Sequence, residues 1–292
     1  MRIAVIADIH GNIHALEQVL RDIDRQRVDH IIVNGDLVNR GPNNIDVLER
    51  LVPLGLPTTL GNHEDFLYHF ARENSDGIPH EWYVDPFWQS TRRVAEQLAE
   101  KGWDSYFAGL EMTYQPEIPA APPVLVAHGT PRHNREGLGR YTPQAVLDDL
   151  SRDYPAAVYV GSHIHAQWLL HRNGHTFVNT GAVGMPFNRD PRAQYLILEL
   201  RQEGWHCDFR AVEYDRQAAI DAYEKSGYLR PGDMATMLFR EEMRLARALF
   251  GPYWRWIEET GEKPGWQSWR LFQERYPERY AGILSGAGEG NS

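Results

Sequence analysis

The chain has 292 residues, of which 42% are hydrophobic and 24% charged, an ordinary composition for a globular protein with a sizeable core. Its formal net charge of -10 argues against strong non-specific binding of nucleic acid, because counterion release requires clustered cations. The single cysteine, Cys207, excludes an intrachain disulfide and fits a reducing compartment.

The N-terminal sequence predicts a cytoplasmic protein without membrane contact. The apolar run at residues 3–7 is too short for a signal peptide and is followed by the carboxylate of Asp8. No stretch of the sequence approaches the roughly 20 apolar residues that span a bilayer.

Short apolar runs and helically spaced segments alternate at the start of the chain. The runs at residues 2–7 and 30–34 are predicted as buried strands, and residues 57–60 as a third strand. Helices are predicted after Asn12, a candidate N-cap, and at residues 44–51. This alternation is typical of an α/β fold with a parallel sheet.

Residues 73–123 form an insert rich in aromatic residues. A helix is predicted near residues 91–101, and the Pro-rich residues 116–123 are predicted as a loop. Core packing is the simplest role for these aromatic side chains, and a lid over a substrate is the alternative.

Strands are predicted again at residues 124–127, 157–161, 176–179, 194–200 and 206–212. The last three follow one another without long helices, which predicts a second, more antiparallel sheet. We expect residues 1–214 to form one domain and residues 215–292 a helical, Trp-rich extension with a disordered tail at 285–292.

Within the extension, four apolar residues recur at the spacing of an amphipathic helix. They are Phe239, Met243, Ala246 and Phe250. The Gly-Pro pair at residues 251–252 is expected to end this helix.

Five short motifs place polar side chains directly after predicted strands, where open α/β sheets form their sites. In an extended Asp-x-His or His-x-His segment, both side chains project to the same side, so each pair is able to chelate one ion. The motifs are Asp-Ile-His-Gly at residues 8–11, Gly-Asp at 35–36, Gly-Asn-His-Glu at 61–64, His-Gly at 128–129 and His-Ile-His at 163–165.

The motifs supply seven candidate ligands with oxygen and imidazole donors and no thiolate. Such a set suits Mn, Fe, Zn, Ni or Co rather than Ca or a structural zinc. Seven ligands are too many for one small ion, so we predict two divalent transition metal ions roughly 3.5–4 Å apart that share the bridging carboxylate of Asp36. The ligands are Asp8, His10, Asp36, Asn62, His128, His163 and His165.

The order of these motifs resembles the calcineurin-like metallophosphoesterase superfamily over residues 3–165. Residues 179–186 and 190–193 are similar to its stand-alone bacterial phosphodiesterase/phosphatase branch. Residues 35–42 and 61–64 resemble the protein Ser/Thr phosphatases and diadenosine tetraphosphatases. The resemblance implies two facing mixed β-sheets flanked by helices, with the metals at the strand ends between the sheets.

The resemblance also implies a division of roles. A metal-bridging hydroxide is expected to attack the phosphorus of a phosphomonoester or phosphodiester. His63 is expected to act as the general acid or as a hydrogen-bond donor to the transition state, and Arg40 is expected to bind phosphate oxygens through its guanidinium fork. One ion is expected on Asp8, His10 and His165, and the other on Asn62, His128 and His163.

The sequence departs from the family pattern at two positions. Where this chain has Asn39, protein phosphatases have an Asp that pairs with the catalytic His. The superfamily usually has Gly directly before the His-x-His pair, whereas in this chain Ser162 separates Gly161 from His163. A phosphopeptide or a dinucleoside polyphosphate remains an alternative to a small phosphate ester as substrate. A non-catalytic binding scaffold is disfavoured, because all seven ligands and His63 are present.

Overall fold

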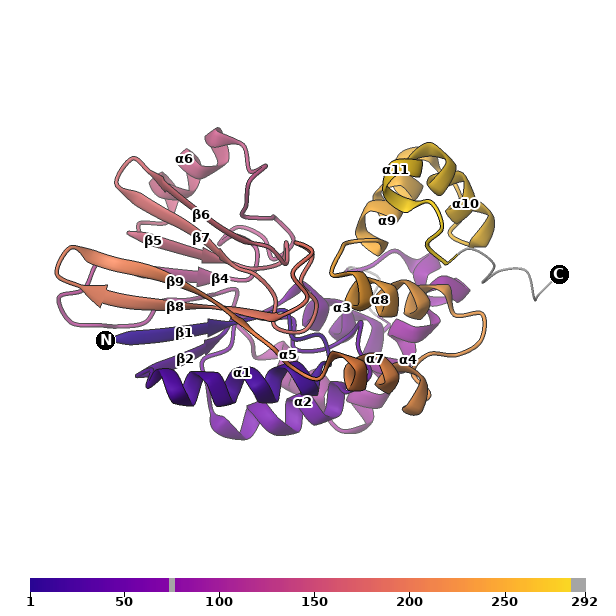
Figure 1. Cartoon of the computed structure of the whole chain (residues 1–292), viewed down its shortest axis with the longest axis horizontal. Helices are drawn as coiled ribbons and strands as arrows, with labels where there is room; N and C mark the ends of the chain where they lie inside the picture. The colour runs from indigo at the N-terminus through magenta and orange to yellow at the C-terminus, as the bar shows by residue number, and fades with distance from the viewer. Residues whose placement is uncertain (74–76, 285–292) are drawn as a thin grey trace.

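A computed structural model describes residues 1–73 and 77–284, so the predicted disordered tail lies outside the described residues. Two mixed β-sheets face each other and helices flank them, which confirms the predicted α/β sandwich. Figure 1 shows the sheets on one side of the molecule and the C-terminal helices on the other. Among the described residues, no helix has the length and apolar character needed to cross a membrane.

The first sheet has the strand order β2-β1-β8-β9. Here β1 (Arg2–Ile6) is parallel to β2 (His30–Val33), and β8 (Ala193–Arg201) is antiparallel to both β1 and β9 (Gly204–Val212). Both faces of β1 are buried, because Ile3 and Val5 lie in the core between the sheets while Ala4 and Ile6 lie in the core under the first helix. This two-sided burial explains the unbroken apolar sequence of β1.

The second sheet has the strand order β3-β4-β5-β7-β6. Its parallel strands are β4, β5 and β7, and β6 forms an antiparallel hairpin with β7. The strands are β3 (Thr113–Tyr114), β4 (Val124–Ala127), β5 (Val158–Gly161), β6 (Gln167–Arg172) and β7 (His175–Thr180).

Two strand predictions are wrong. The last three predicted strands do not share a sheet, because β7 pairs with β5 whereas β8 pairs with β1. Backbone hydrogen bonds from Val183 to Ala7 and from Gly184 to Asp8 lead the chain from one sheet to the other. Residues 57–60 form only isolated bridges, to Val33 and Glu111, since a proline at the start of this segment lacks an N–H for a continuous ladder.

Helices cover the outer faces of both sheets. The first sheet is covered by α1 (Ile13–Gln26), with α2 (Asn44–Leu51) and η1 (Val52–Leu54) beside it, and the second by α6 (Gln144–Asp153) (Figure 1). Asn12 is the predicted cap of α1, and its Oδ1 accepts a hydrogen bond of 3.0 Å from the N–H of Ala15.

The aromatic insert is mostly helical and joins the C-terminal helices. Trp88 is buried, Trp82 stacks on it with ring centroids 4.3 Å apart, and Trp254 of the extension packs edge-on against both. These contacts are core packing of the kind expected for large aromatic residues. The helix α3 (Asn62–Ala71) precedes the insert, and the helices within the insert are η2 (His80–Tyr83), η3 (Pro86–Trp88), α4 (Gln89–Glu100) and α5 (Trp103–Ala108).

The extension is helical, but one predicted boundary within it is wrong. The helix that contains Phe239 ends at Leu245, where Ala246 adopts a left-handed φ of 49°. Gly251 and Pro252 lie in the first turn of the next helix, where the missing N–H of proline is tolerated. The helices are α7 (Arg216–Lys225), α8 (Met234–Leu245), α9 (Phe250–Thr260), α10 (Trp266–Arg275) and α11 (Pro277–Tyr280).

Candidate metal centre

The predicted ligands lie beyond the carboxyl ends of β1, β2, β4 and β5 and at the start of α3. The expectation of extended Asp-x-His and His-x-His segments is wrong, because the strands end before these residues and the chain turns. The N–H of His10 donates to the carbonyl of Asp36 at 3.0 Å, which joins the first two loops. Positive φ values of 49° to 63° are found at Asp8, His10, Asp36, His163 and His165.

Six of the predicted ligands gather in two groups of side chains, and Asp36 belongs to both. Within each group, one potential ligand atom per residue lies within 4.8 Å of the others. His163 and His165 fall into different groups. The first group contains Asp8, His10, Asp36 and His165, and the second contains Asp36, His128 and His163.

Asn62 lies against the second group. It begins α3, and its Oδ1 is 3.1 Å from Nε2 of His128 and 2.8 Å from Nδ1 of His163. The structure therefore brings all seven predicted ligands together.

Two carboxylate oxygens point into this cluster without a hydrogen-bond partner among the described residues. They are Oδ1 of Asp8, which is 3.3 Å from Nε2 of His165, and Oδ2 of Asp36, which is 3.2 Å from Nε2 of His128. Metal–ligand bonds of about 2.0–2.2 Å place ligand atoms about 3–3.5 Å apart. A buried, unpaired carboxylate oxygen is costly unless a cation compensates it, so these residues fit divalent ions.

Three histidines are oriented by a hydrogen bond from Nδ1 to a backbone carbonyl. Only a protonated ring nitrogen can donate to a carbonyl, so Nδ1 carries a proton and Nε2 is the atom that would coordinate an ion whenever the ring is neutral. The pairs are His10 with Val38 at 3.2 Å, His128 with Asn34 at 2.8 Å and His165 with Met185 at 2.5 Å.

The protonation of the imidazoles follows from burial and charge. Burial lowers the pKa of His163 to about 3, and the nearby His128 adds to this effect, so His163 is neutral and free to coordinate. Burial also opposes protonation of His128, but the carboxylates of Asp36 and Asp8 outweigh it and raise the pKa of His128 to about 10. The carboxylates of Asp36 and Asp8 therefore strongly favour a positive charge at the position of His128.

Glu64 supports the cluster and was not predicted as a site residue. It is fully buried, and its oxygens accept the backbone N–H groups of Asp36 at 2.8 Å and of Leu37 at 2.7 Å. Burial and the negative charge of Asp36 raise the pKa of Glu64 to about 8, although the hydrogen bonds favour its ionised form. Glu64 thus fixes the loop that carries the shared carboxylate. The place of Glu64 in the Gly-Asn-His-Glu motif was the feature of the sequence that could have identified it as a site residue.

His63 and Arg40 lie beside the ligands. The His63 ring is edge-on to that of His10, with centroids 4.8 Å apart, and its Nε2 accepts a hydrogen bond of 3.2 Å from Nε of Arg40. The side-chain amide of Asn39 is 2.9 Å from Nδ1 of His63. Desolvation lowers the pKa of His63 well below its ordinary value, against the opposing effect of Asp36.

A second unpredicted residue, Glu242 of α8, forms a buried ion pair with Arg40, with Oε2 at 2.7 Å from Nη1. Glu242 lies in the extension and in none of the five motifs, so the sequence held no local signal for it.

Residues 1–167 match the calcineurin-like phosphoesterase family, a span that contains every predicted ligand. The chain belongs to this family. The predicted resemblance to the superfamily is confirmed.

The chain is 28% identical to an uncharacterised protein of Methanocaldococcus jannaschii over 238 residues, which cover 77% of this chain and 92% of the relative. A crystal structure of a metallophosphoesterase from Sphaerobacter thermophilus shares the fold, with a TM-score of 0.62, 24% identity and coverage of 84% of this chain and 100% of that one. A symmetrical bis(5'-nucleosyl)-tetraphosphatase of Nitrosococcus oceani is 39% identical over 67 residues, 22% of this chain and 24% of the relative.

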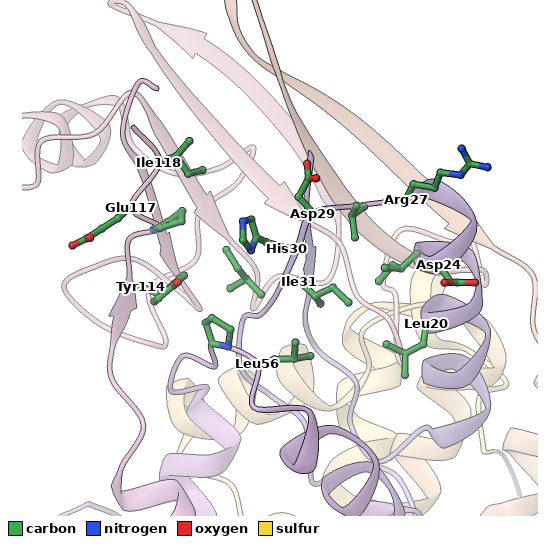
Figure 2. A pocket seen from close by; sticks show the side chains of 15 residues that line it. Leu20, Asp24, Arg27, Asp29, His30, Ile31, Leu56, Tyr114, Glu117 and Ile118 are labelled. Carbon is green, nitrogen blue, oxygen red and sulfur yellow. The ribbon is translucent and has the colours of Figure 1, made fainter. Parts of the chain in front are cut away.

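A surface cavity of about 590 Å³ lies elsewhere on the protein (Figure 2). Figure 2 shows lining side chains from the second half of α1, such as Leu20 and Asp24, from the start of β2, such as His30, and from the segment around Tyr114. None of the predicted ligands is among the described residues that line it. The cavity is at the amino end of β2, whereas Asp36 follows its carboxyl end, so cavity size does not locate the chemistry here.

Proposed function

We propose that this protein hydrolyses phosphomonoesters or phosphodiesters with two divalent transition metal ions. The observation that carries the proposal is the carboxylate of Asp36, which is shared by both ligand groups and has one oxygen free of hydrogen bonds among the described residues. A carboxylate shared between two sets of imidazole and oxygen donors is the arrangement that a dinuclear hydrolase requires.

The residues divide between the ions as the family resemblance implies. The metals, chosen from Mn, Fe, Zn, Ni and Co by the donor set, would polarise the phosphate and supply an activated water when bound. The first ion would be held by Asp8, His10, Asp36 and His165, and the second by Asp36, Asn62, His128 and His163.

His63 is proposed to donate a proton to the leaving oxygen, and Arg40 to bind the phosphate. The desolvated ring of His63 is neutral, so its Nε2 can accept the N–H of Arg40. An anionic phosphate beside it favours the imidazolium and raises its pKa, and the protonated ring no longer accepts from Arg40. The guanidinium of Arg40 has five N–H groups, of which Nε already donates to His63 and Nη1 to Glu242. The remaining N–H groups are available to phosphate oxygens.

Dinucleoside polyphosphates form a second candidate substrate class, favoured by the 67 residues similar to the symmetrical tetraphosphatase of Nitrosococcus oceani. A phosphopeptide is a third. A cytoplasmic location, the division of the chain at residue 214 and a lid role for the aromatic insert also remain predictions.

A substrate panel tests the proposal. The metal-stripped protein is reconstituted with Mn, Fe, Ni, Co, Zn or Mg and assayed with an aryl phosphate monoester, an aryl diester, a cyclic nucleotide, a dinucleoside polyphosphate and a phosphopeptide. We expect metal-dependent release of product from at least one class, with two transition ions per chain by elemental analysis. Folded protein that binds no transition ion would refute the proposal.

A further inference from the structure

Arg40 is held in place from the C-terminal extension. We propose that Glu242 is a positioning residue of the active site, which fixes the guanidinium of Arg40 for phosphate binding and thereby makes α8 part of the catalytic apparatus. The inference rests on the proposed phosphoesterase function and extends it to a residue outside the matched family segment, residues 1–167.

The carboxylate of Glu242 is buried and fully engaged. Its Oε2 lies 2.7 Å from Nη1 of Arg40, and its Oε1 accepts the backbone N–H groups of Leu249 and Phe250, at 2.7 Å and 2.8 Å, at the start of α9. A carboxylate with both oxygens bound to ordered groups has one orientation, so it can hold the guanidinium in one orientation.

The backbone of Arg40 is also fixed by the extension. Arg40 has a left-handed φ of 64°, which is unfavourable for a residue with a side chain and requires support from its surroundings. The hydroxyl of Tyr223 in α7 donates a hydrogen bond of 2.9 Å to the carbonyl of Arg40. The guanidinium carbon lies 5.2 Å from the ring centroid of Phe239 and 5.5 Å from that of Phe250.

This arrangement connects the extension to the reacting groups in two steps. Glu242 binds Nη1 of Arg40, and Nε of Arg40 donates to Nε2 of His63 at 3.2 Å. Glu242 does not touch the ligands, so it acts through Arg40. Without the carboxylate, the guanidinium can rotate away from the phosphate and from His63, and a gain in disorder of this kind weakens phosphate binding.

The variant Glu242→Gln isolates the contact. Its amide oxygen can still accept the N–H groups at the start of α9, but its NH₂ group cannot accept from Arg40. Asp233→Asn is the matched control, because Asp233 is a buried carboxylate of the same segment that pairs with Arg93 at 2.9 Å, away from the predicted ligands, and asparagine can still cap α8.

With p-nitrophenyl phosphate as substrate and inorganic phosphate as inhibitor, Glu242→Gln should lower kcat/KM about 10- to 100-fold and raise the inhibition constant of phosphate by a similar factor. Asp233→Asn should change both less than about threefold. Metal content should equal that of the wild type in both variants. In an Arg40→Ala background, Glu242→Gln should have little further effect, because the contact that it removes is already absent.

The proposal is overturned if Glu242→Gln keeps wild-type kinetics, or if it lowers kcat/KM by the same factor with and without Arg40. If Glu242→Gln fails to fold, Glu242→Asp, which retains the charge but shortens the reach, serves instead with the same expected direction. If the wild type hydrolyses no substrate, the proposed function fails, and calorimetric titration of the metal-loaded protein with inorganic phosphate still decides the positioning role. Equal phosphate affinity in wild type and variant would then refute it.

Discussion

His63 and Asp36 are linked by a hydrogen bond of 2.8 Å from the backbone N–H of His63 to Oδ1 of Asp36. The other oxygen of this carboxylate, Oδ2, faces Nε2 of His10 at 3.6 Å and Nε2 of His128 at 3.2 Å. The same side chain therefore connects the two ligand groups and fixes the start of α3, which carries Asn62 and His63.

Replacing Asp36 with Asn should separate these two effects. The amide oxygen can still accept the N–H of His63, but the negative charge shared by the ligand groups is lost. We expect metal content to fall below two ions per chain and kcat/KM to fall about 100-fold or more. Elemental analysis and initial rates measure both, with the exposed Asp148→Asn as control. Retention of two ions and of full activity would contradict the bridging role.

His63→Ala should keep both ions, because its side chain lies beside the ligands and is not among them. The rate should fall more for alkyl phosphates than for p-nitrophenyl phosphate, because a poor leaving group depends more on a proton donor. A plot of log kcat/KM against leaving-group pKa tests this with a series of esters. Parallel lines for wild type and variant would argue against a general-acid role.

Asn39→Asp should change the pH dependence of the reaction. The side chain of Asn39 lies 2.9 Å from Nδ1 of His63, so a carboxylate there would favour the imidazolium and raise the pKa of His63. The alkaline limb of the pH–rate profile should therefore move to higher pH. An unmoved limb, with normal metal content, would mean that His63 does not determine it.

The position of the site could be predicted from the sequence because polar motifs followed buried runs, and chains of this class build sites at strand ends. The local backbone conformation could not be predicted, because the sequence Asp-Ile-His is compatible both with an extended segment and with the left-handed conformation found at Asp8 and His10. The contact between Arg40 and Glu242 could not be predicted either, because the two residues are 202 positions apart in the sequence.

The pairing of the strands was also predicted incorrectly. Alternation of apolar residues shows which face of a strand is buried, but it does not identify the neighbouring strand. Residues 194–200 were therefore assigned to the same sheet as residues 176–179, whereas β8 inserts beside β1. Pro252 was ambiguous for a related reason, since proline is common both after a helix and in its first turn.

The extension should contribute strongly to stability through Trp269 of α10. Its side chain is 1% exposed and contacts the rings of Tyr253, Phe272 and Tyr280. Trp269→Ala should lower the free energy of unfolding by about 3–5 kcal/mol. Leu271→Ala in the same helix is the control. Because Leu271 is 41% exposed, this substitution should lower the free energy of unfolding by less than about 1 kcal/mol. Urea denaturation measures both, and equal costs would contradict the packing described here.

Cys207 should react slowly with thiol reagents, and its modification should not affect catalysis. Burial raises the pKa of this thiol to about 11, so the reactive thiolate is only about 0.1% of the population at pH 8. The rate of reaction with iodoacetamide should be about 100-fold higher in urea and should rise with pH up to about 11. Rapid inactivation of the native protein at pH 8 would instead implicate Cys207 in the chemistry.

Each ligand group takes side chains from loops that follow strands of both sheets. In the first ligand group, Asp8 follows β1 of the first sheet and His165 follows β5 of the second. In the second ligand group, Asp36 follows β2 of the first sheet and His128 follows β4 of the second. An ion bound by either group would act as a cross-link between the two halves of the sandwich, in a chain without an intrachain disulfide. Metal supply would then govern the lifetime of the folded protein as well as its turnover. The melting temperature should rise with metal concentration and fall in a chelator, by the mass action that couples binding to folding.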